Sequence, residues 1–396
     1  MALPHRPAQT TLRLPRALPL ARRHFHTSPR PRTQHSLPAS YYRGGTSRAI
    51  MFSRADLPAS RAAWSPIFLG ALGSPDPQHG RQLDGLGGGI SSLSKVCVVG
   101  ASERADADVE FTFVAVGVRD AEVDFSSNCG NMLAAVGPFA VDRGIVHVGE
   151  GDGETVVRIF NTNTGKIIKA RFAVEGGEAV ARGGFAIDGV SGTGAKVELA
   201  FLDPAGSKTG ALLPTSSPTT TLDTNVPATC IDVGNPCVFV PAAALGLPTP
   251  LPLPDAIDAD PALLARLERI RRQAGKAMRL CASAADCPAS VPKIAVVSPA
   301  PQPSDVDLVV RALSVGQPHR AVPITVALAL AAASRIEGTV VSDVVPAKRV
   351  DECGVTVGHP SGRLLVTARF GKDGAVSEAT VFRTARRLMM GTVFWK

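Results

Sequence analysis

The sequence lacks several patterns that would place it in a familiar functional class. No apolar run approaches the ~20 residues that a helix needs to cross a bilayer, so we do not expect a membrane protein. Its seven cysteines are odd in number and form no Cys-x-x-Cys pair, and no His-Glu-x-x-His motif occurs. We therefore expect neither a disulfide framework nor a metal site. The glycine-rich stretch 84–100 fits neither a dinucleotide fingerprint nor a P-loop.

Acidic residues and lysine are absent from residues 1–40. This segment contains seven arginines among serine, threonine and scattered leucines, and removing their charge from the net +8 leaves +1 for the rest of the chain. The basic character belongs to a tail rather than to a folded face, so we do not expect nucleic-acid binding.

The composition of this tail is typical of an organelle presequence, disordered until it is removed. Arg23, Phe25 and Ser28 match the mitochondrial processing pattern Arg-x-Phe-x-x-Ser. We expect a mitochondrial matrix protein whose mature form begins near Thr33. The alternative is a plain basic tail on a cytoplasmic protein.

The remaining chain is long enough for two domains with full cores, and its composition is that of a globular protein. A stretch rich in Pro, Ser, Thr and Gly, residues 204–228, marks a boundary between halves. We place an N-terminal domain at 41–205 and a C-terminal domain at 206–396, with the last segment free to return to the first domain.

The stretch 123–146 is the centre of the first domain. A strand end runs into a polar turn and then into an apolar segment closed by Gly144, which predicts a helix with Asn128 as its N-cap. Cys129, Gly130 and Asn131 would lie where unpaired N–H groups and the helix dipole favour a bound carboxylate. The alternative is that Cys129 is only a small core side chain.

An Arg-Gly-Gly-Thr-Ser run precedes an early strand. Its two glycines permit close backbone approach, and Arg43, Thr46 and Ser47 offer donors that suit a carboxylate. An ordinary glycine turn before an edge strand would look the same.

Ser94 and Lys95 stand between a glycine-rich loop and a buried strand. Desolvation at this position would make the neutral, basic form of the Lys95 amine accessible. A strand-end lysine that only extends into solvent is the alternative.

The second half repeats the order of the first. Residues 316–340 read as a polar turn with His319 and Arg320, followed by an Ala-rich helix with Pro323 at its first position. The later Ser-Gly-Arg-Leu-Leu of 361–365 echoes the Thr-Gly-Lys-Ile-Ile of 164–168, a predicted hairpin. We infer two similar domains with both helix N-termini pointing into one cleft.

The motifs RGGTSR, DGLGGGISSLSK, SSNCGNMLAAVGPFA, HPSG and RTARRLMMG together resemble the PrpF family of 2-methylaconitate and aconitate isomerases, from about residue 41 to 396. The resemblance implies an α+β fold similar to diaminopimelate epimerase. This fold has two pseudo-symmetric domains, each a curved, mostly antiparallel sheet or barrel around a central helix. It also implies that Lys95 and Cys129 are catalytic and that Ser361 and Gly362 bind substrate.

Two departures from the family pattern concern the substrate. Arg48 stands where lysine is often found, and Leu93 where threonine is common. Both would change which tricarboxylate fits without changing the chemistry.

The implied activity is a cofactor-independent isomerisation of an unsaturated tricarboxylate, such as 2-methylaconitate or aconitate. Neutral Lys95 would remove an allylic proton, and the conjugated carboxylates would carry the charge until rotation or reprotonation gives the isomer. Arg43 and the two helix turns, at 128–131 and at 319–320, would hold the carboxylates. Cys129 would be the partner acid or a positioning group.

Three alternatives stay open at this stage: an amino-acid racemase, a methylitaconate-type double-bond isomerase, and an inactive tricarboxylate-binding protein. A two-thiol racemase fits poorly, because His319 and Arg320, not a cysteine, open the second helix. The expected partner is a small tricarboxylate, with no metal and no organic cofactor. The oligomeric state is open, a homodimer included.

Overall fold

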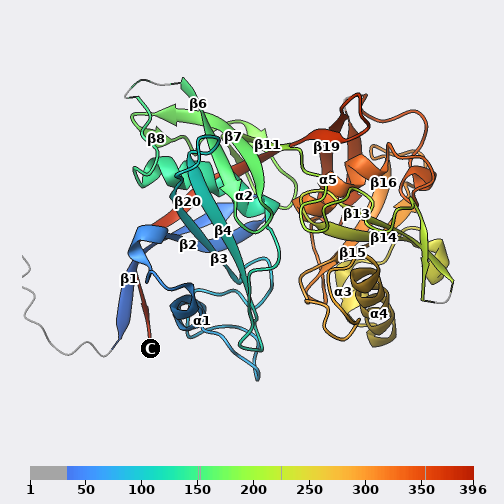
Figure 1. Cartoon of the computed structure of the whole chain (residues 1–396), viewed down its shortest axis with the longest axis horizontal. Helices are drawn as coiled ribbons and strands as arrows, with labels where there is room; N and C mark the ends of the chain where they lie inside the picture. The colour runs from blue at the N-terminus through green and yellow to red at the C-terminus, as the bar shows by residue number, and fades with distance from the viewer. Residues whose placement is uncertain (1–33, 150, 152, 224, 353) are drawn as a thin grey trace, which may run out of the picture.

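The computed structural model describes residues 34–396 except 150, 152, 224 and 353. Two lobes lie side by side, and the last strand, β20 (Val376–Trp395), runs from the second lobe back along the first (Figure 1). The proposed presequence up to residue 33, with its cleavage point, lies outside the described residues. No helix within the described ranges is both long and apolar enough to span a bilayer.

Eight strands of the first lobe form a closed barrel. Their pairing is antiparallel except at two parallel steps, β2–β3 and β4–β6, and β20 closes the ring between β11 and β1. In ring order they are β1 (His35–Gly44), β2 (Ser47–Ser53), β3 (Lys95–Ala101), β4 (Val109–Val116), β6 (Gly153–Asn161), β7 (Lys166–Glu175), β11 (Lys196–Leu202) and β20.

The first strand begins earlier than the sequence predicted. Residues 35–40, predicted to lie in the tail ahead of the domain at 41–205, form the first part of β1 and pair with the end of β20, from His35 opposite Trp395 to Ser40 opposite Met390. The partner strand lies at the far end of the chain, so local composition carries no sign of this pairing.

The helix α2 (Gly130–Asp142) fills the barrel. Residues 130–141 are all buried, as expected for a helix that is apolar on every side. Gly144, at φ 66°, adopts the left-handed conformation just beyond the helix end, which confirms its predicted role as the stop. The predicted N-cap is wrong by one residue, because Cys129 occupies that position.

The second lobe is a curved sheet with a helix on each face. The buried helix α5 (Ile324–Ala333) packs on the inner face, and α4 (Pro261–Ala277), with an Asp260 N-cap, covers the outer face. The sheet strands are β12 (Thr220–Leu222), β13 (Val226–Asp232), β14 (Pro236–Pro241), β15 (Lys293–Pro299), β16 (Leu308–Ser314), β18 (Val355–His359) and β19 (Gly362–Phe370).

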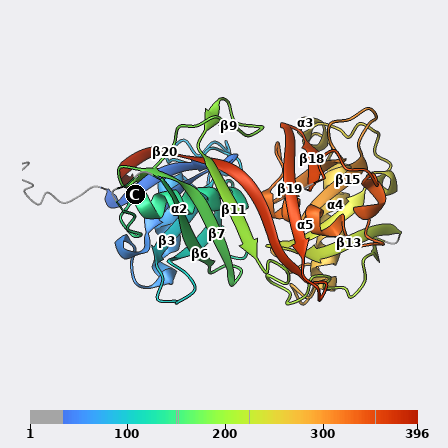
Figure 2. The same cartoon turned by 90° about the horizontal axis from the view of Figure 1, so that it is seen from above.

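The two lobes repeat one topology, as predicted. Strands β2-β3-β4-β6-β7 pair in the order parallel, antiparallel, parallel, antiparallel, and β14-β15-β16-β18-β19 pair in the same order. The two hairpins with the echoed sequences, β6–β7 and β18–β19, occupy equivalent places. Figure 2 shows β20 bridging the two lobes above their central helices. Pro323 precedes the second helix as its N-cap instead of opening it.

The remaining elements lie outside this repeat. They are α1 (Trp64–Leu72), β5 (Val123–Asp124), β8 (Glu178–Ala179), β9 (Phe185–Ala186), β10 (Thr193–Gly194), α3 (Pro254–Asp258), β17 (Gln317–Pro318) and four short 3₁₀ turns, at Arg54–Asp56, Arg61–Ala63, Ala243–Leu245 and Ser342–Val344.

Candidate functional site

Strand periodicity turns a lysine of each lobe toward its central helix. In β3, Lys95 alternates with Val96 and therefore shares its face with Cys97 and Val99, which pack against α2. In β15, Lys293 stands at the equivalent first position, on the face of Ala295 and Val297 that packs against α5. Both lysines are buried, at 7% and 6% exposure.

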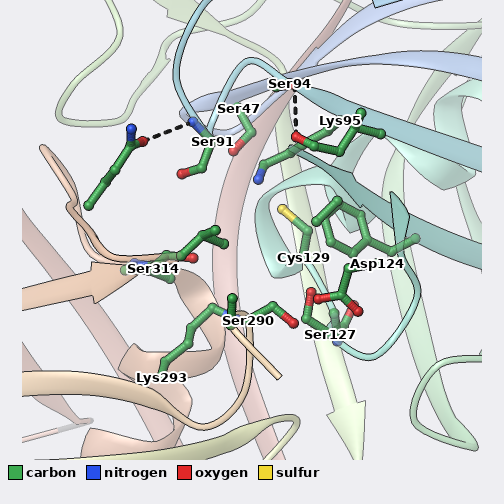
Figure 3. A pocket seen from close by; sticks show the side chains of 18 of the residues that line it. Ser47, Ser91, Ser94, Lys95, Asp124, Ser127, Cys129, Ser290, Lys293 and Ser314 are labelled. Atoms are coloured by element: carbon green, nitrogen blue, oxygen red, sulfur yellow. Dashed lines mark hydrogen bonds between the residues drawn. The ribbon is translucent and has the colours of Figure 1, made fainter. Parts of the chain in front are cut away.

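These two lysines face one cavity of about 210 Å³ between the lobes. Figure 3 shows Lys95 and Cys129 on one wall and Lys293 with Ser290 on the other. The first lobe contributes Ser47, Ser91, Ser94, Lys95, Phe113, Asp124, Ser127, Asn128, Cys129, Gly130 and Asn131, and the second contributes Ser290, Lys293, Ser314, Gln317, His319, Pro323, Ile324 and Thr325.

The first turns of both central helices open into this cavity. Gly130 and Ile324, the first residues of α2 and α5, touch: a Cβ at Gly130 would lie 2.5 Å from the Ile324 Cβ. The N–H groups of a first helical turn have no acceptor within the helix, so two positive helix ends converge here. Such a site favours an anion.

Lys95 and Cys129 line the same cavity. The Cys129 sulfur and the Lys95 amino group point toward each other in Figure 3. The Lys95 amine also lies 5.3 Å from the centre of the Phe113 ring. The structure therefore brings together the two residues that the sequence singled out as catalytic.

The glycine-rich loop before Lys95 wraps around a buried glutamine. Gln82 Nε2 donates to Ser94 Oγ at 2.8 Å, and Gln82 Oε1 accepts from Gly89 N at 2.9 Å. Ser94 Oγ donates to the Val116 carbonyl at 3.0 Å. Ser94 lines the cavity, but its hydroxyl already holds the loop in place, so its main contact is with the scaffold.

Asn128 is buried rather than free to cap the helix. Its Nδ2 donates to the Gly234 carbonyl of the second lobe at 3.4 Å, and its Oδ1 accepts from Asn161 Nδ2 at 2.7 Å. The predicted candidate therefore lies in the cavity wall, where it ties the helix entrance to both lobes. Because the helix begins at Gly130, Cys129 holds the N-cap position, without a side-chain cap hydrogen bond.

Arg43 does not reach the cavity. Its guanidinium donates to the carbonyl oxygens of Gly45 and Thr384 and to Thr384 Oγ1, each at 3.0 Å. Burial, followed by the nearby charge of Arg386, lowers its pKa from the usual value. Arg43 thus fastens β20 to the turn after β1, and its expected role as a carboxylate clamp has no support in the geometry.

The rest of the Arg-Gly-Gly-Thr-Ser run shapes the entrance of α2. A Cβ at Gly44 would lie 2.6 Å from the Asn131 carbonyl oxygen, and Gly45 has φ 51°, so both positions require glycine. Thr46 Oγ1 accepts from Asn131 Nδ2 at 3.2 Å, which orients the Asn131 side chain. Ser47 lines the cavity directly.

Arg320 and Ser361 lie in an outer hollow of about 370 Å³ that adjoins the cavity at His319. Arg320 pairs with Asp255 at 2.6 Å, and Ser361 Oγ donates to the Arg320 carbonyl at 2.6 Å. Thr46 lines the same hollow. Gly362 lines neither space. Its φ of 136° and its contact with Asp188 indicate that Gly362 shapes the turn that leads into β19.

Charged side chains of both signs line the cavity: the cations Lys95, Arg119 and Lys293, and the carboxylates of Asp120, Glu122 and Asp124. Burial lowers the pKa of Lys293, and the charge of Lys95 acts in the same direction. Burial and the Lys95 charge lower the pKa of His319 to about 4, so this imidazole is neutral and does not serve as a cation. At one rim, burial and two neighbouring aspartates raise the pKa of Glu122.

Lys293, Ser290, Ser127 and Thr325 were not among the sequence-predicted site residues. A signal for Lys293 existed, because Lys-Val-Cys-Val-Val at 95–99 is matched by Lys-Ile-Ala-Val-Val at 293–297. Within the described residues, no group of three or more His, Cys, Asp or Glu side chains is arranged to hold a metal ion.

Sequence relatives cover nearly the whole chain. A (4E)-oxalomesaconate Delta-isomerase of Novosphingobium sp. (strain KA1) is 40% identical over 92% of this chain and 99% of its own length. A 3-methylitaconate isomerase of Eubacterium barkeri is 37% identical, and a 2-methyl-aconitate isomerase of Cupriavidus necator is 38% identical. Both of these matches cover 91% of this chain and 97% of the relative.

Solved structures agree with the observed fold. The crystal structure of a methylitaconate-delta-isomerase matches with a TM-score of 0.73 and 38% identity, over 91% of this chain and 96% of that one. A hydroxyproline epimerase from Agrobacterium vitis matches with a TM-score of 0.53 at 13% identity, over 91% and 92% of the two chains, which shows the shared fold alone. The predicted epimerase-like α+β class is confirmed.

One family model spans the described chain. It carries the description "PrpF protein" and matches residues 34–396. Together with relatives at about 40% identity that are named isomerases, this match shows that the chain is an isomerase of the PrpF family.

Proposed function

We propose that this isomerase moves an allylic proton of an unsaturated tricarboxylate, of the 2-methylaconitate or aconitate type, with Lys95 as the base. The observation that carries the proposal is the position of Lys95. Its buried amino group faces Cys129 in the cavity where the first turns of α2 and α5 converge.

The proposed step needs no group beyond the substrate and these side chains. The Lys95 amine, in the deprotonated form that a base requires, takes a proton from the allylic CH₂, and the C–H electron pair spreads over the alkene and its conjugated carboxylate as a dienolate. The N–H groups at the two helix ends stabilise the added negative charge. The proton then returns, either to the original carbon after rotation or to the other end of the allyl unit.

Cys129 fits the role of partner acid in this scheme. Of the cysteines in the described part of the chain, it alone lines the cavity. The nearby Cys237 is buried behind the wall, and burial raises the pKa of its thiol to about 12. A racemase that works with two opposed thiols therefore has only one of them here, and the racemase alternative is disfavoured.

The experiment is direct. Purified protein in deuterated water is incubated separately with cis-aconitate, 2-methylaconitate and methylitaconate, and proton NMR follows both isomer formation and deuterium entry at the allylic position. We expect exchange and a new isomer with at least one tricarboxylate. Turnover of methylitaconate alone would transfer the assignment to a dicarboxylate double-bond isomerase. Binding without any exchange would favour an inactive carboxylate-binding protein.

Two further proposals concern the protein's context. We propose import into the mitochondrial matrix, supported by the arginine-rich, acid-free composition of residues 1–40. A fluorescent fusion that carries only these residues should enter mitochondria, and a cytoplasmic distribution would contradict the proposal. The second is a homodimer: the sequence leaves the oligomeric state open, and sedimentation of the purified protein would distinguish a homodimer from a monomer.

A further inference from the structure

Lys293 is the counterpart of Lys95 in the second lobe. Each lysine is the first residue of its strand, and each strand pairs in parallel with the preceding one and antiparallel with the next. The pseudo-symmetry of the fold therefore directs both side chains to the interface of the lobes. In Figure 3, the Lys293 side chain extends from the wall of the second lobe toward Ser290 and the cavity.

Among the described residues, the Lys293 amine has no ion-pair partner. Lys293 is only 6% exposed, and no carboxylate oxygen of the described residues lies within 4.0 Å of its amine. Against the effect of burial, the charge of Asp124, which lines the same cavity, raises the pKa of Lys293, but the two side chains form no ion pair within 4.0 Å. Instead, Asp124 Oδ1 accepts the Ser126 N–H at 2.6 Å. A buried, unpaired ammonium is costly, which makes it a candidate for ligand binding rather than for stability.

The surroundings of Lys293 supply hydroxyl groups. Ser290 and Ser127 line the cavity wall beside it, one from each lobe. Ser290 Oγ lies 2.8 Å from Ser126 Oγ, so this hydrogen bond also joins the two lobes. An ammonium and hydroxyl donors next to a helix N-terminus form a typical carboxylate site.

The position of Lys293 separates its role from that of Lys95. The Cys129 sulfur points toward Lys95, whereas Lys293 rises from the opposite wall. A substrate whose reacting CH₂ lies between Lys95 and Cys129 would present a distant carboxylate to Lys293.

We propose that Lys293 is a substrate-binding residue that anchors a carboxylate remote from the proton transfer and thereby selects polycarboxylates. This inference depends on the proposed function only for the class of substrate. It assigns the second lobe a direct part in recognition, beyond the contribution of its helix end.

Binding is tested with a ligand that cannot react. Isothermal titration of the full protein with the saturated propane-1,2,3-tricarboxylate measures affinity without turnover. A charge-assisted contact of this kind predicts that Lys293→Met weakens binding by about 10- to 100-fold. Lys293→Arg should retain most of the affinity because it keeps the charge. Lys169→Met, at an exposed position of β7, is the matched control and should leave binding unchanged.

Kinetics then separate anchoring from catalysis. With a substrate that the wild type converts, Lys293→Met should raise KM by at least 10-fold while kcat stays within a few-fold. Loss of kcat at unchanged affinity would overturn the proposal and make Lys293 a proton-transfer group. Unchanged affinity in both Lys293→Met and Lys293→Gln, with folding verified by circular dichroism, would also overturn it. If the wild type converts no substrate, the titration still decides the role of Lys293 while the proposed reaction fails.

Discussion

Gly130 and Ile324 bring the two central helices into contact at their N-terminal ends. A single added carbon at Gly130 would overlap the Ile324 side chain, at 2.5 Å from its Cβ. This contact sets the separation of the two helix ends that bound the cavity. The site therefore requires a residue without a side chain at position 130.

Gly130→Ala should separate these helix ends. Because small displacements of binding groups weaken transition-state stabilisation strongly, we expect kcat/KM to fall by about 100-fold. The measurement is steady-state kinetics together with a thermal melt. Gly391→Ala, in β20, is the control, because no atom of the described residues lies within 4 Å of the added carbon. Wild-type kinetics in Gly130→Ala would show that the spacing of the helix ends does not matter.

Asn128→Asp should weaken substrate binding, and it should also lower stability because a carboxylate cannot donate to the Gly234 carbonyl. An aspartate can still accept from Asn161 Nδ2, but it adds a negative charge to a cavity that we expect to hold carboxylates. A like charge at ~5 Å costs about 3.3 kcal/mol at an effective dielectric constant of about 20, which corresponds to roughly 250-fold in affinity. Titration with propane-1,2,3-tricarboxylate measures the effect. Asn225→Asp, on the surface, controls for the added charge. Equal affinities for wild type and Asn128→Asp would argue against an anion site beside Asn128.

His359 should make the protein sensitive to mild acid. Burial, followed by the charge of Arg383, lowers its pKa from 6.5 to about 4, and its Nδ1 accepts the Ser361 N–H at 3.3 Å. Between about pH 6.5 and pH 4 the unfolded chain binds a proton at this residue that the folded chain does not, so the free energy of unfolding falls as the pH falls.

The full shift corresponds to about 3 kcal/mol at most. Urea unfolding of the wild type and of His359→Gln across this pH range measures it, because glutamine can accept the same N–H without titrating. Parallel pH profiles for the two proteins would exclude His359 as the source of the acid sensitivity.

Much of the local structure was predictable from the sequence. The helix ending before Gly144 and the hairpin at 161–166 both follow from turn and capping residues close in the chain. Lys95 was also placed correctly at the start of a buried strand, because the glycine-rich loop and the apolar run are both local patterns.

The missed features depend on partners far away in the sequence. Arg43 suits a carboxylate by its chemistry, but the oxygens that it binds belong to Thr384 in a strand that returns from the C-terminal end. Lys293 begins a strand whose sequence resembles that of any other buried strand. Only its equivalence to Lys95 in the repeated lobe marks it as a site residue. The chemistry of a single residue cannot reveal that Arg43 contacts Thr384 or that Lys293 is equivalent to Lys95. Both relationships depend on how β20 and β15 pair with other strands.

Loss of the Lys95 amine tests the central claim most directly. Lys95→Met keeps the length and burial of the side chain but cannot accept a proton. With a substrate that the wild type converts in deuterated water, we predict that Lys95→Met reduces allylic deuterium entry by at least 1,000-fold, a typical general-base contribution, while propane-1,2,3-tricarboxylate still binds. Exchange within ten-fold of the wild-type rate would contradict the account and assign proton abstraction to another group.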